Sequence, residues 1–193
     1  MRETRQRKYI RALFSILMVA VFMIVTGCDR ADTEEKDNTR QEQQKKDEAG
    51  KNTPAAKDTL TVTVYYPDDN GMYLIGETRT VEVKNDKYKA VLDSLLQGTK
   101  KKGVVNIIPK EAKLRSVKVA GDTATVDFSG EFTKKFTGGS TGEELMVGSI
   151  VNTLTEFSEI QNVIFKVNGK SIETIAGHMD MSVPQKRMTD LIK

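Results

Sequence analysis

The sequence predicts an α+β domain, with a largely antiparallel or mixed β-sheet and two main helices packed on one face. Two short hairpin signals, Gly121-Asp122 and Asn168-Gly169, each lie between segments in which apolar residues alternate. Two other segments space their apolar residues three and four positions apart, as amphipathic helices do. The predicted order is strand–strand–helix–strand–strand–helix–strand–strand, and hairpins separated by helices are typical of α+β domains. Crossovers through the helices allow some strand pairs to be parallel.

The first two strands are predicted from alternation. Apolar residues occupy every second position over residues 60–64, which predicts a half-buried strand. Residues 67–71 are rich in turn formers and end that strand. A second strand is expected over residues 78–83, with Val81 and Val83 on one face.

The first helix is expected after Asn85-Asp86, because both residues favour the N-cap position. Gly98 is expected to end it as a left-handed C′ residue. The apolar stripe between these ends consists of Tyr88, Val91, Leu92 and Leu95.

The central hairpin is expected over residues 117–128. Its turn, Gly121-Asp122, has glycine first, which favours type II′. Phe132 and Phe136 are expected on a short helical turn after the hairpin.

The second helix has two alternative starts, since Ser140 with Glu143 and Thr141 with Glu144 are both spaced as capping boxes. Its apolar stripe consists of Val147, Ile150, Val151, Leu154 and Phe157. Alternation then predicts a strand ahead of the second hairpin turn, over 163–167. A short terminal helix is expected around Met188, Leu191 and Ile192.

The N-terminal region points to the membrane. Cys28, the only cysteine, follows Val25-Thr26-Gly27 directly. An uncharged apolar run over residues 12–25 precedes it, behind a start with five basic residues and one acid. This arrangement resembles the bacterial lipoprotein signal, in which a lipobox ends in a cysteine that carries lipid and becomes the mature N-terminus. We therefore expect lipid on Cys28 and a lipid-anchored protein on the extracytoplasmic face of the cell membrane.

Two alternatives remain for this segment. An uncleaved anchor helix would need about 20 apolar residues, and the apolar run is shorter than that. Ordinary cleaved secretion is the other alternative. Because basic residues precede the run, the lipoprotein and the anchor both place the bulk of the chain outside.

The chain divides into four expected segments. Residues 1–27 are expected to be the lipoprotein signal peptide, and 28–58 a disordered charged linker. Residues 29–58 contain no aromatic residue and no aliphatic residue larger than alanine, so they offer little apolar surface to bury. A single domain is expected over 59–184, followed by a C-terminal tail at 185–193.

The charge and composition exclude several classes of function. The region from Thr59 onward carries a net charge of only +1, with both signs interspersed, so we expect no nucleic-acid partner. His178 is the only histidine, and one histidine does not supply a typical zinc site. We therefore expect no metal, no cofactor, no catalytic residue and no enzymatic activity.

Three clusters offer alternatives to that expectation. Asp127 and Glu131 fit paired glycosidase carboxylates, although capping of the next helix by Asp127 or Ser129 is the simpler interpretation. Lys100-Lys101-Lys102 fits a contact with anionic lipid or wall polymer, but a solvated loop is simpler. The tyrosines near the first turn are candidates for a small-ligand or cell-wall glycan site, although alternation turns one of the first two toward the core: Tyr65, Tyr66 and Tyr73.

A family resemblance joins these motifs. The most telling segment is 149–157, with the sequence SIVNTLTEF. The others, in chain order, are 60–67, 90–98, 108–109, 126–132, 138–140, 163–169 and 177–182. Together they resemble the sporulation and spore-germination domain family, GerMN, from about Leu60 to Pro184.

The resemblance implies a mixed α/β domain outside the membrane of Gram-positive, often spore-forming, bacteria. It carries no catalytic residues over to this chain. It implies a building block of envelope assemblies, so an envelope protein partner or self-assembly is expected, in sporulation or germination. The protein that names the family has two copies of the domain, whereas this chain has one. Family members commonly have proline after the glycine that ends the first helix, where this chain has Thr99.

Overall fold

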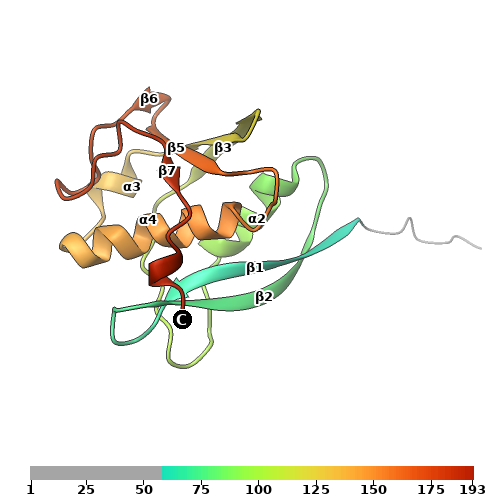
Figure 1. The fold of residues 1–193 in the computed structure, drawn as a ribbon, viewed down its shortest axis with the longest axis horizontal. Coiled ribbons are helices and arrows are strands. Elements are labelled where there is room, and N and C mark those ends of the chain that lie inside the picture. The colour runs from blue at the N-terminus through green and yellow to red at the C-terminus, as the bar shows by residue number, and fades with distance from the viewer. Residues whose placement is uncertain (1–57) are drawn as a thin grey trace, which may run out of the picture. The chain divides into compact units, whose positions relative to one another are not determined.

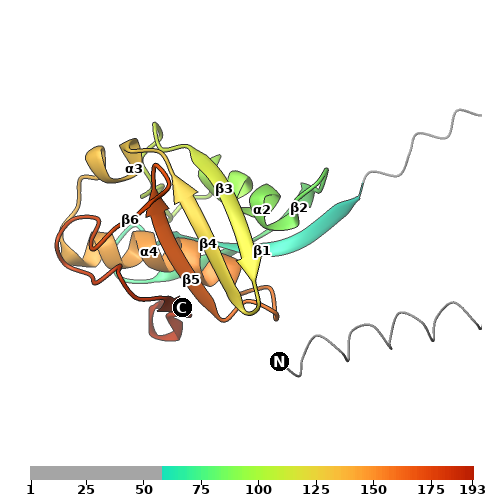
Figure 2. The same ribbon diagram turned by 90° about the horizontal axis from the view of Figure 1, so that it is seen from above.

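The computed structural model describes residues 58–193, which form three layers (Figures 1 and 2). A two-stranded ribbon lies on one side, helices lie in the middle, and a larger sheet covers the other side. The ribbon consists of β1 (Thr59–Pro67) and β2 (Leu74–Glu82). The helices are α2 (Lys87–Leu96), α3 (Glu131–Lys134), α4 (Ser140–Leu154) and the 3-10 turn η1 (Thr189–Leu191). The larger sheet contains β3 (Leu114–Ala120), β4 (Thr123–Phe128), β5 (Asn162–Val167), β6 (Lys170–Ser171) and β7 (Gln185–Lys186).

The α+β class and the two main helices are confirmed, but the strands form two sheets rather than one. The larger sheet has the order β3-β4-β5-β6, and β7 pairs with β5. The β4–β5 pair is parallel, because the chain crosses over through α3 and α4. The ribbon is separate because α4 contacts β1 on one side and β5 on the other, so the helices keep the sheets apart.

Both predicted hairpin turns are present, and their backbone conformations differ. Gly121 has φ 59° while Asp122 stays at negative φ, which is the pattern of a type II′ turn. Asn168 (φ 53°) and Gly169 (φ 79°) are both left-handed, which is the pattern of type I′. Each turn therefore has the residue types that its geometry requires.

Helix α2 has the ends that the sequence predicts. The Asp86 carboxylate accepts hydrogen bonds from the backbone N–H groups of Tyr88 (3.0 Å) and Lys89 (3.1 Å). Gly98 has φ 76° and donates its N–H to the Leu95 carbonyl at 3.0 Å. By contrast, β2 begins four residues before the predicted start, because Leu74 still pairs with Pro67 in register with β1.

The predicted capping box of α4 is wrong. The N-cap residue is Gly139, and no side chain caps the first turn. Ser140 and Thr141 are exposed, and the Glu143 carboxylate bonds backbone groups of residues 175–178. A tertiary contact therefore determines where the Glu143 side chain lies.

Glu143 is fully buried, with 0% exposure. Its carboxylate accepts N–H groups from Ile175 (3.0 Å), Ala176 (3.1 Å) and His178 (3.0 Å), and the Thr174 hydroxyl at 3.2 Å. Burial by itself raises the pKa of Glu143, but the backbone donors outweigh it and hold the pKa below its usual value. The carboxylate thus fixes the loop after β6 against α4.

Helix α4 is buried nearly all round, including its polar residues. Ser149 donates to the Leu145 carbonyl at 2.8 Å, and Thr153 accepts the Tyr65 N–H at 3.1 Å. Asn152 bonds both backbone groups of Met188, at 2.8 and 3.0 Å. These hydrogen bonds satisfy side chains that burial would otherwise penalise.

The last nine residues pack against both sheets. Strand β7 pairs with β5, and η1 contains part of the expected terminal helix. Arg187 reaches Glu156 (2.6 Å) and the Tyr65 hydroxyl (3.0 Å), and its guanidinium lies 5.6 Å from the Tyr65 ring centre. The Lys193 N–H donates to the Leu74 carbonyl at 3.1 Å, so the chain ends beside the start of β2.

Candidate interaction surface along strand β2

The residues predicted for lipid attachment lie outside the described range. Cys28 and its lipobox, Val25-Thr26-Gly27, precede residue 58, so the lipid anchor remains a prediction. Within residues 58–193, no helix is long and apolar enough to cross a bilayer.

The two candidate catalytic carboxylates, Asp127 and Glu131, have separate partners. Asp127 accepts the Gly169 N–H at 2.8 Å and pairs with Arg115 Nε at 3.1 Å, so it holds the second hairpin turn. Glu131 bonds the Ser129 hydroxyl instead, which lowers its pKa. No side chain caps α3, so the capping interpretation of Asp127 and Ser129 is also wrong.

The other candidates for chemistry have structural or solvated positions. His178 is exposed, and its backbone N–H bonds Glu143. The three lysines at 100–102 are exposed on a loop, as the simpler interpretation predicts. No group of three His, Cys, Asp or Glu side chains placed to hold a metal occurs in the part of the chain that the structure describes.

The three tyrosines do not share a pocket. Tyr66 is 3% exposed and donates its hydroxyl to the Leu95 carbonyl at 2.9 Å, inside the main core. Tyr65 is also buried, at 6%, but on the opposite face of β1, where its hydroxyl donates to Glu156 at 2.9 Å. Tyr73 is 38% exposed beside Lys193. The expectation that one of the first two faces the core is met by Tyr66, and the Arg187 contact accounts for the burial of the other.

An open surface lies along β2 instead. Two depressions of about 620 and 660 Å³ meet beside α2 and share Thr80, Ser94 and Gln97. Their lining includes the side chains of β2 that face the helices: Glu77, Arg79 and Val81. The other side of the surface is lined by Lys89 and Asp93 on α2. We call this surface the β2–α2 groove.

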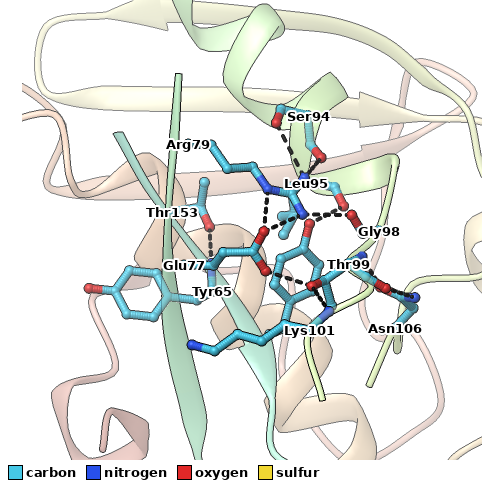
Figure 3. Close-up of polar contacts among 11 residues, drawn as sticks. Tyr65, Glu77, Arg79, Ser94, Leu95, Gly98, Thr99, Lys101, Asn106 and Thr153 are labelled. Atoms are coloured by element: carbon cyan, nitrogen blue, oxygen red, sulfur yellow. Dashed lines mark hydrogen bonds and ion pairs between the residues drawn. The ribbon is translucent and has the colours of Figure 1, made fainter. Parts of the chain in front are cut away.

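Arg79 connects β2 to the C-terminal end of α2, the two sides of the groove (Figure 3). Its guanidinium donates to the Ser94 carbonyl at 2.5 Å and to the Gly98 carbonyl at 2.7 Å, at the C-terminal end of α2. It also pairs with Glu77 at 2.9 Å. A cation at the carbonyl end of a helix is favourable because the unpaired carbonyls there carry partial negative charge.

Glu77 extends this network to the following loop. Its second oxygen accepts the Thr99 hydroxyl at 2.6 Å. Burial raises the pKa of Glu77, but the bonds from Thr99 and Arg79 outweigh it, so the pKa lies below its usual value. The Glu77 and Arg79 side chains that line the groove are therefore charged and held by fixed partners.

The backbone of β2 is open along its outer edge. The Val83 N–H donates to the Asp58 carbonyl and the Asp68 N–H to the Tyr73 carbonyl, both at 2.8 Å. This alternation pairs the odd-numbered residues of β2 with β1 and turns the even-numbered ones outward. At Leu74 the outward carbonyl is taken by Lys193.

Three further residues of β2 present their N–H and C=O groups outward: Gly76, Thr78 and Thr80. None of these backbone groups has a hydrogen-bond partner among residues 58–193. Thr78 and Thr80 are also exposed at their side chains. An unpaired edge of this kind is a template for an added strand.

The sequence predicted a strand here but missed the site. The local pattern identifies Thr78 and Thr80 as residues on the solvent side of a strand. It does not show whether a neighbouring strand is absent. Arg79 was missed because its partners lie 15 and 19 residues further along. The available signal was one arginine placed among threonines in a strand with a half-buried face.

Comparison with known proteins identifies the family. The family described as Germane, sporulation and spore germination, matches residues 63–173, more than half of the chain. The chain belongs to this family. The spore germination protein GerM of Bacillus subtilis (strain 168) is 30% identical over 138 residues, which are 67% of this chain and 37% of that protein. This Germane chain therefore spans little more than a third of that relative.

Two solved structures resemble this Germane domain. The tandem GerMN domains of the sporulation protein GerM from Bacillus subtilis match with a TM-score of 0.57 and 25% identity, over 67% of this chain and 46% of that chain. A candidate lipoprotein from Clostridium perfringens matches with a TM-score of 0.50 and 22% identity, over 71% of this chain and 93% of that chain. At that identity the second likeness concerns the fold alone. The resemblance to the GerMN family that the sequence suggested is confirmed.

Proposed function

We propose that this chain is a lipid-anchored, non-enzymatic envelope protein that binds other proteins during sporulation or germination. The single observation that carries the proposal is the open outer edge of β2, at Gly76, Thr78 and Thr80. Backbone groups at a sheet edge give affinity to an added strand, and neighbouring side chains give specificity. The family membership supports the setting, because its description is sporulation and spore germination.

The proposal that the chain is not an enzyme is supported by the arrangement of its reactive side chains. Asp127, Glu131 and His178 each have separate structural partners or an exposed position. A general acid–base pair or an activated nucleophile needs its members within hydrogen-bonding reach of each other or of one substrate. The three tyrosines lie apart, so they do not support a small-ligand or glycan site.

The binding role is tested by site-specific photo-crosslinking in the native host. A photoreactive residue replaces Thr80 in the full chain, and a second strain carries it at Lys118 on strand β3 as the matched control. We expect adducts with envelope proteins from position 80 and few from position 118. Equal yields at the two positions, or none at position 80, would contradict binding through β2.

The anchor is tested separately. Cys28→Ala is expected to abolish incorporation of labelled fatty acid and to leave an uncleaved precursor, because the acylated sulfur is missing. Thr33→Ala, in the expected linker, is the control and should keep both lipid and processing. Labelling that survives in Cys28→Ala would reject lipid attachment at this cysteine.

A further inference from the structure

We propose that a second copy of this chain pairs with β2 edge to edge and antiparallel, with Thr78 opposite Thr78 of the second copy. The proposal rests on the proposed function, because it names the partner of the same open edge. Joined in this way, two ribbons form one four-stranded sheet with the order β1–β2–β2–β1. The three outward residues of each β2 then pair with their counterparts.

Backbone geometry restricts the register. Outward N–H and C=O groups stand at even positions of β2, so an antiparallel partner must bring even positions opposite even positions. With Thr78 opposite its counterpart, Gly76 lies opposite Thr80 of the second copy, and the reverse. Every outward group from Gly76 to Thr80 then has a partner. Slides by one residue lose this pairing.

Side-chain charge selects one register among the rest. In the proposed register, Glu77 of each copy lies opposite Arg79 of the other, and Ile75 lies opposite Val81. A slide by two residues in one direction sets Glu77 against Glu77, and in the other direction Arg79 against Arg79. Like charges directly opposite each other destabilise a strand pair. The pattern from Ile75 to Val81 is therefore self-complementary in one register.

Longer slides are also disfavoured by the ends of the strand. In one direction, longer slides make Leu74 one of the residues that must pair with the second copy, but the Leu74 carbonyl already accepts the Lys193 N–H. In the other direction they run past Glu82, where β2 ends. The proposed register uses only the stretch of β2 whose outward backbone is open.

The groove leaves room for the added strands. The depressions lie over the inner face of β2, at Glu77, Arg79 and Val81, and α2 lines their far side. The space beside this face of β2 is therefore not filled by α2. The Glu77–Arg79 pair at 2.9 Å in each copy would join its counterpart in a ring of alternating charges.

The size of the contact sets the expected strength. Three outward residues on each side bury far less than the roughly 1,000 Å² of a stable interface, so the pairing is weak in dilute solution. Two copies tethered to one membrane meet at a much higher effective concentration. The association is therefore to be measured on membranes carrying the full chain.

A charge-swap experiment tests the register. Two full-length copies with different epitope tags are co-expressed and crosslinked on membranes, and capture of one by the other is measured. Thr78→Lys in both copies, or Thr78→Glu in both, sets like charges opposite each other and is expected to reduce co-capture about fivefold or more. Thr78→Lys with Thr78→Glu is expected to restore it. Thr61→Lys and Thr61→Glu, on the exposed face of β1, are the controls and should leave co-capture unchanged.

The outcomes separate the partner from the binding role. The register is overturned if co-capture is unchanged when both copies carry Thr78→Lys or both carry Thr78→Glu. It is also overturned if the mixed pair shows no more co-capture than pairs in which both copies carry the same substitution. Failure of wild-type copies to capture each other overturns the second-copy proposal. If adducts at position 80 then still form with other envelope proteins, the proposed function stands without self-pairing. If no adducts form, both proposals fail.

Discussion

The two sheets that enclose the helix layer differ in how they are attached and in how their edges end. The larger sheet packs against the helices mainly through apolar side chains, including the stacked rings of Phe128 and Phe132, 4.3 Å apart. The ribbon adds polar ties to its apolar contacts, through Arg79 and Tyr66 to the carbonyls of α2 and through Tyr65 to Thr153. Both sheets thus contribute to the main apolar core, and the ribbon has polar ties in addition.

Their edges show the same contrast. The outer edge of β3 has a register irregularity between Leu114 and Ser116 and carries the exposed side chains of Arg115 and Lys118. Bulges and charged residues are devices that keep an edge from pairing. The edge of β2 has no register irregularity with β1 and carries threonines at its exposed positions. The difference indicates that β3 is protected against added strands, while β2 is left available.

The largest expected effect is on the side of the larger sheet. Glu143→Ala leaves the N–H groups of Ile175, Ala176 and His178 without an acceptor, so we expect a loss of about 3–5 kcal/mol in the free energy of unfolding. Urea denaturation of the variant measures it. Glu144→Ala, at the exposed neighbour, should change stability by less than about 0.5 kcal/mol. A small loss at Glu143 would mean that the loop is held by other contacts.

The same carboxylate predicts a response to acid. The folded-state pKa of Glu143 lies below its unfolded value of 4.5, so its stabilising contribution is present above pH 4.5 and is lost as the pH falls through the lowered pKa. Glu143→Gln has no carboxylate to protonate, so its stability should fall less steeply below pH 4.5. Parallel slopes for the two proteins would exclude Glu143 as a source of acid sensitivity.

The next effect concerns the ribbon. Arg79→Met keeps much of the apolar stem but removes the bonds to Ser94 and Gly98, and we expect a loss of about 2 kcal/mol. Arg115→Met is the control on the larger sheet, where the side chain is 47% exposed, and should cost about 0.5 kcal/mol. If the two variants lose equal stability, the polar attachment of the ribbon is not what distinguishes it.

Alkaline pH tests the second tie of the ribbon. Burial raises the pKa of Tyr66 to about 12, and Arg79 opposes this only in part. Because the folded-state pKa exceeds the unfolded value of 10.0, the contribution of Tyr66 is complete below pH 10 and is lost as the pH rises toward 12. Tyr66→Phe should therefore lose less stability than the wild type over this range. Burial also raises the pKa of Tyr65 and Tyr88, so ultraviolet titration should show several late-ionising phenols, with one fewer in the variant.

The smallest expected effect on stability is at the open edge. Thr78→Lys and Thr61→Lys both replace exposed threonines of the ribbon, so each should change the free energy of unfolding by about 0.5 kcal/mol or less. Only the former is expected to impair assembly. A large loss of stability in Thr78→Lys alone would show that this edge supports the fold of the single chain.

The class of fold, both hairpin turns and the ends of α2 were predictable, because each depends on residues close together in the sequence. Asn168-Gly169 determines its turn through two left-handed conformations, and Asp86 caps α2 within three residues. The start of β2 was missed because Gly76 interrupts the apolar alternation, while pairing with β1 continues through it.

The candidate site itself was not predictable from local patterns. An open edge is defined by the strands that are not beside it, and Thr78 has the same local signal as a residue in a central strand. The capping prediction for Glu143 failed for a related reason: its partners lie 31 to 35 residues away, and burial made them stronger than a local cap.

The sequence by itself determined the alternation, the turns and the order of the main strands and helices up to residue 167, because these depend on side-chain size and backbone preference over a few residues. Only the tertiary structure decided that α4 separates two sheets, that Arg79 joins β2 to the end of α2, and that β2 keeps an open edge. Those features depend on which distant segments occupy the same space, and a chain read one residue after another does not specify that.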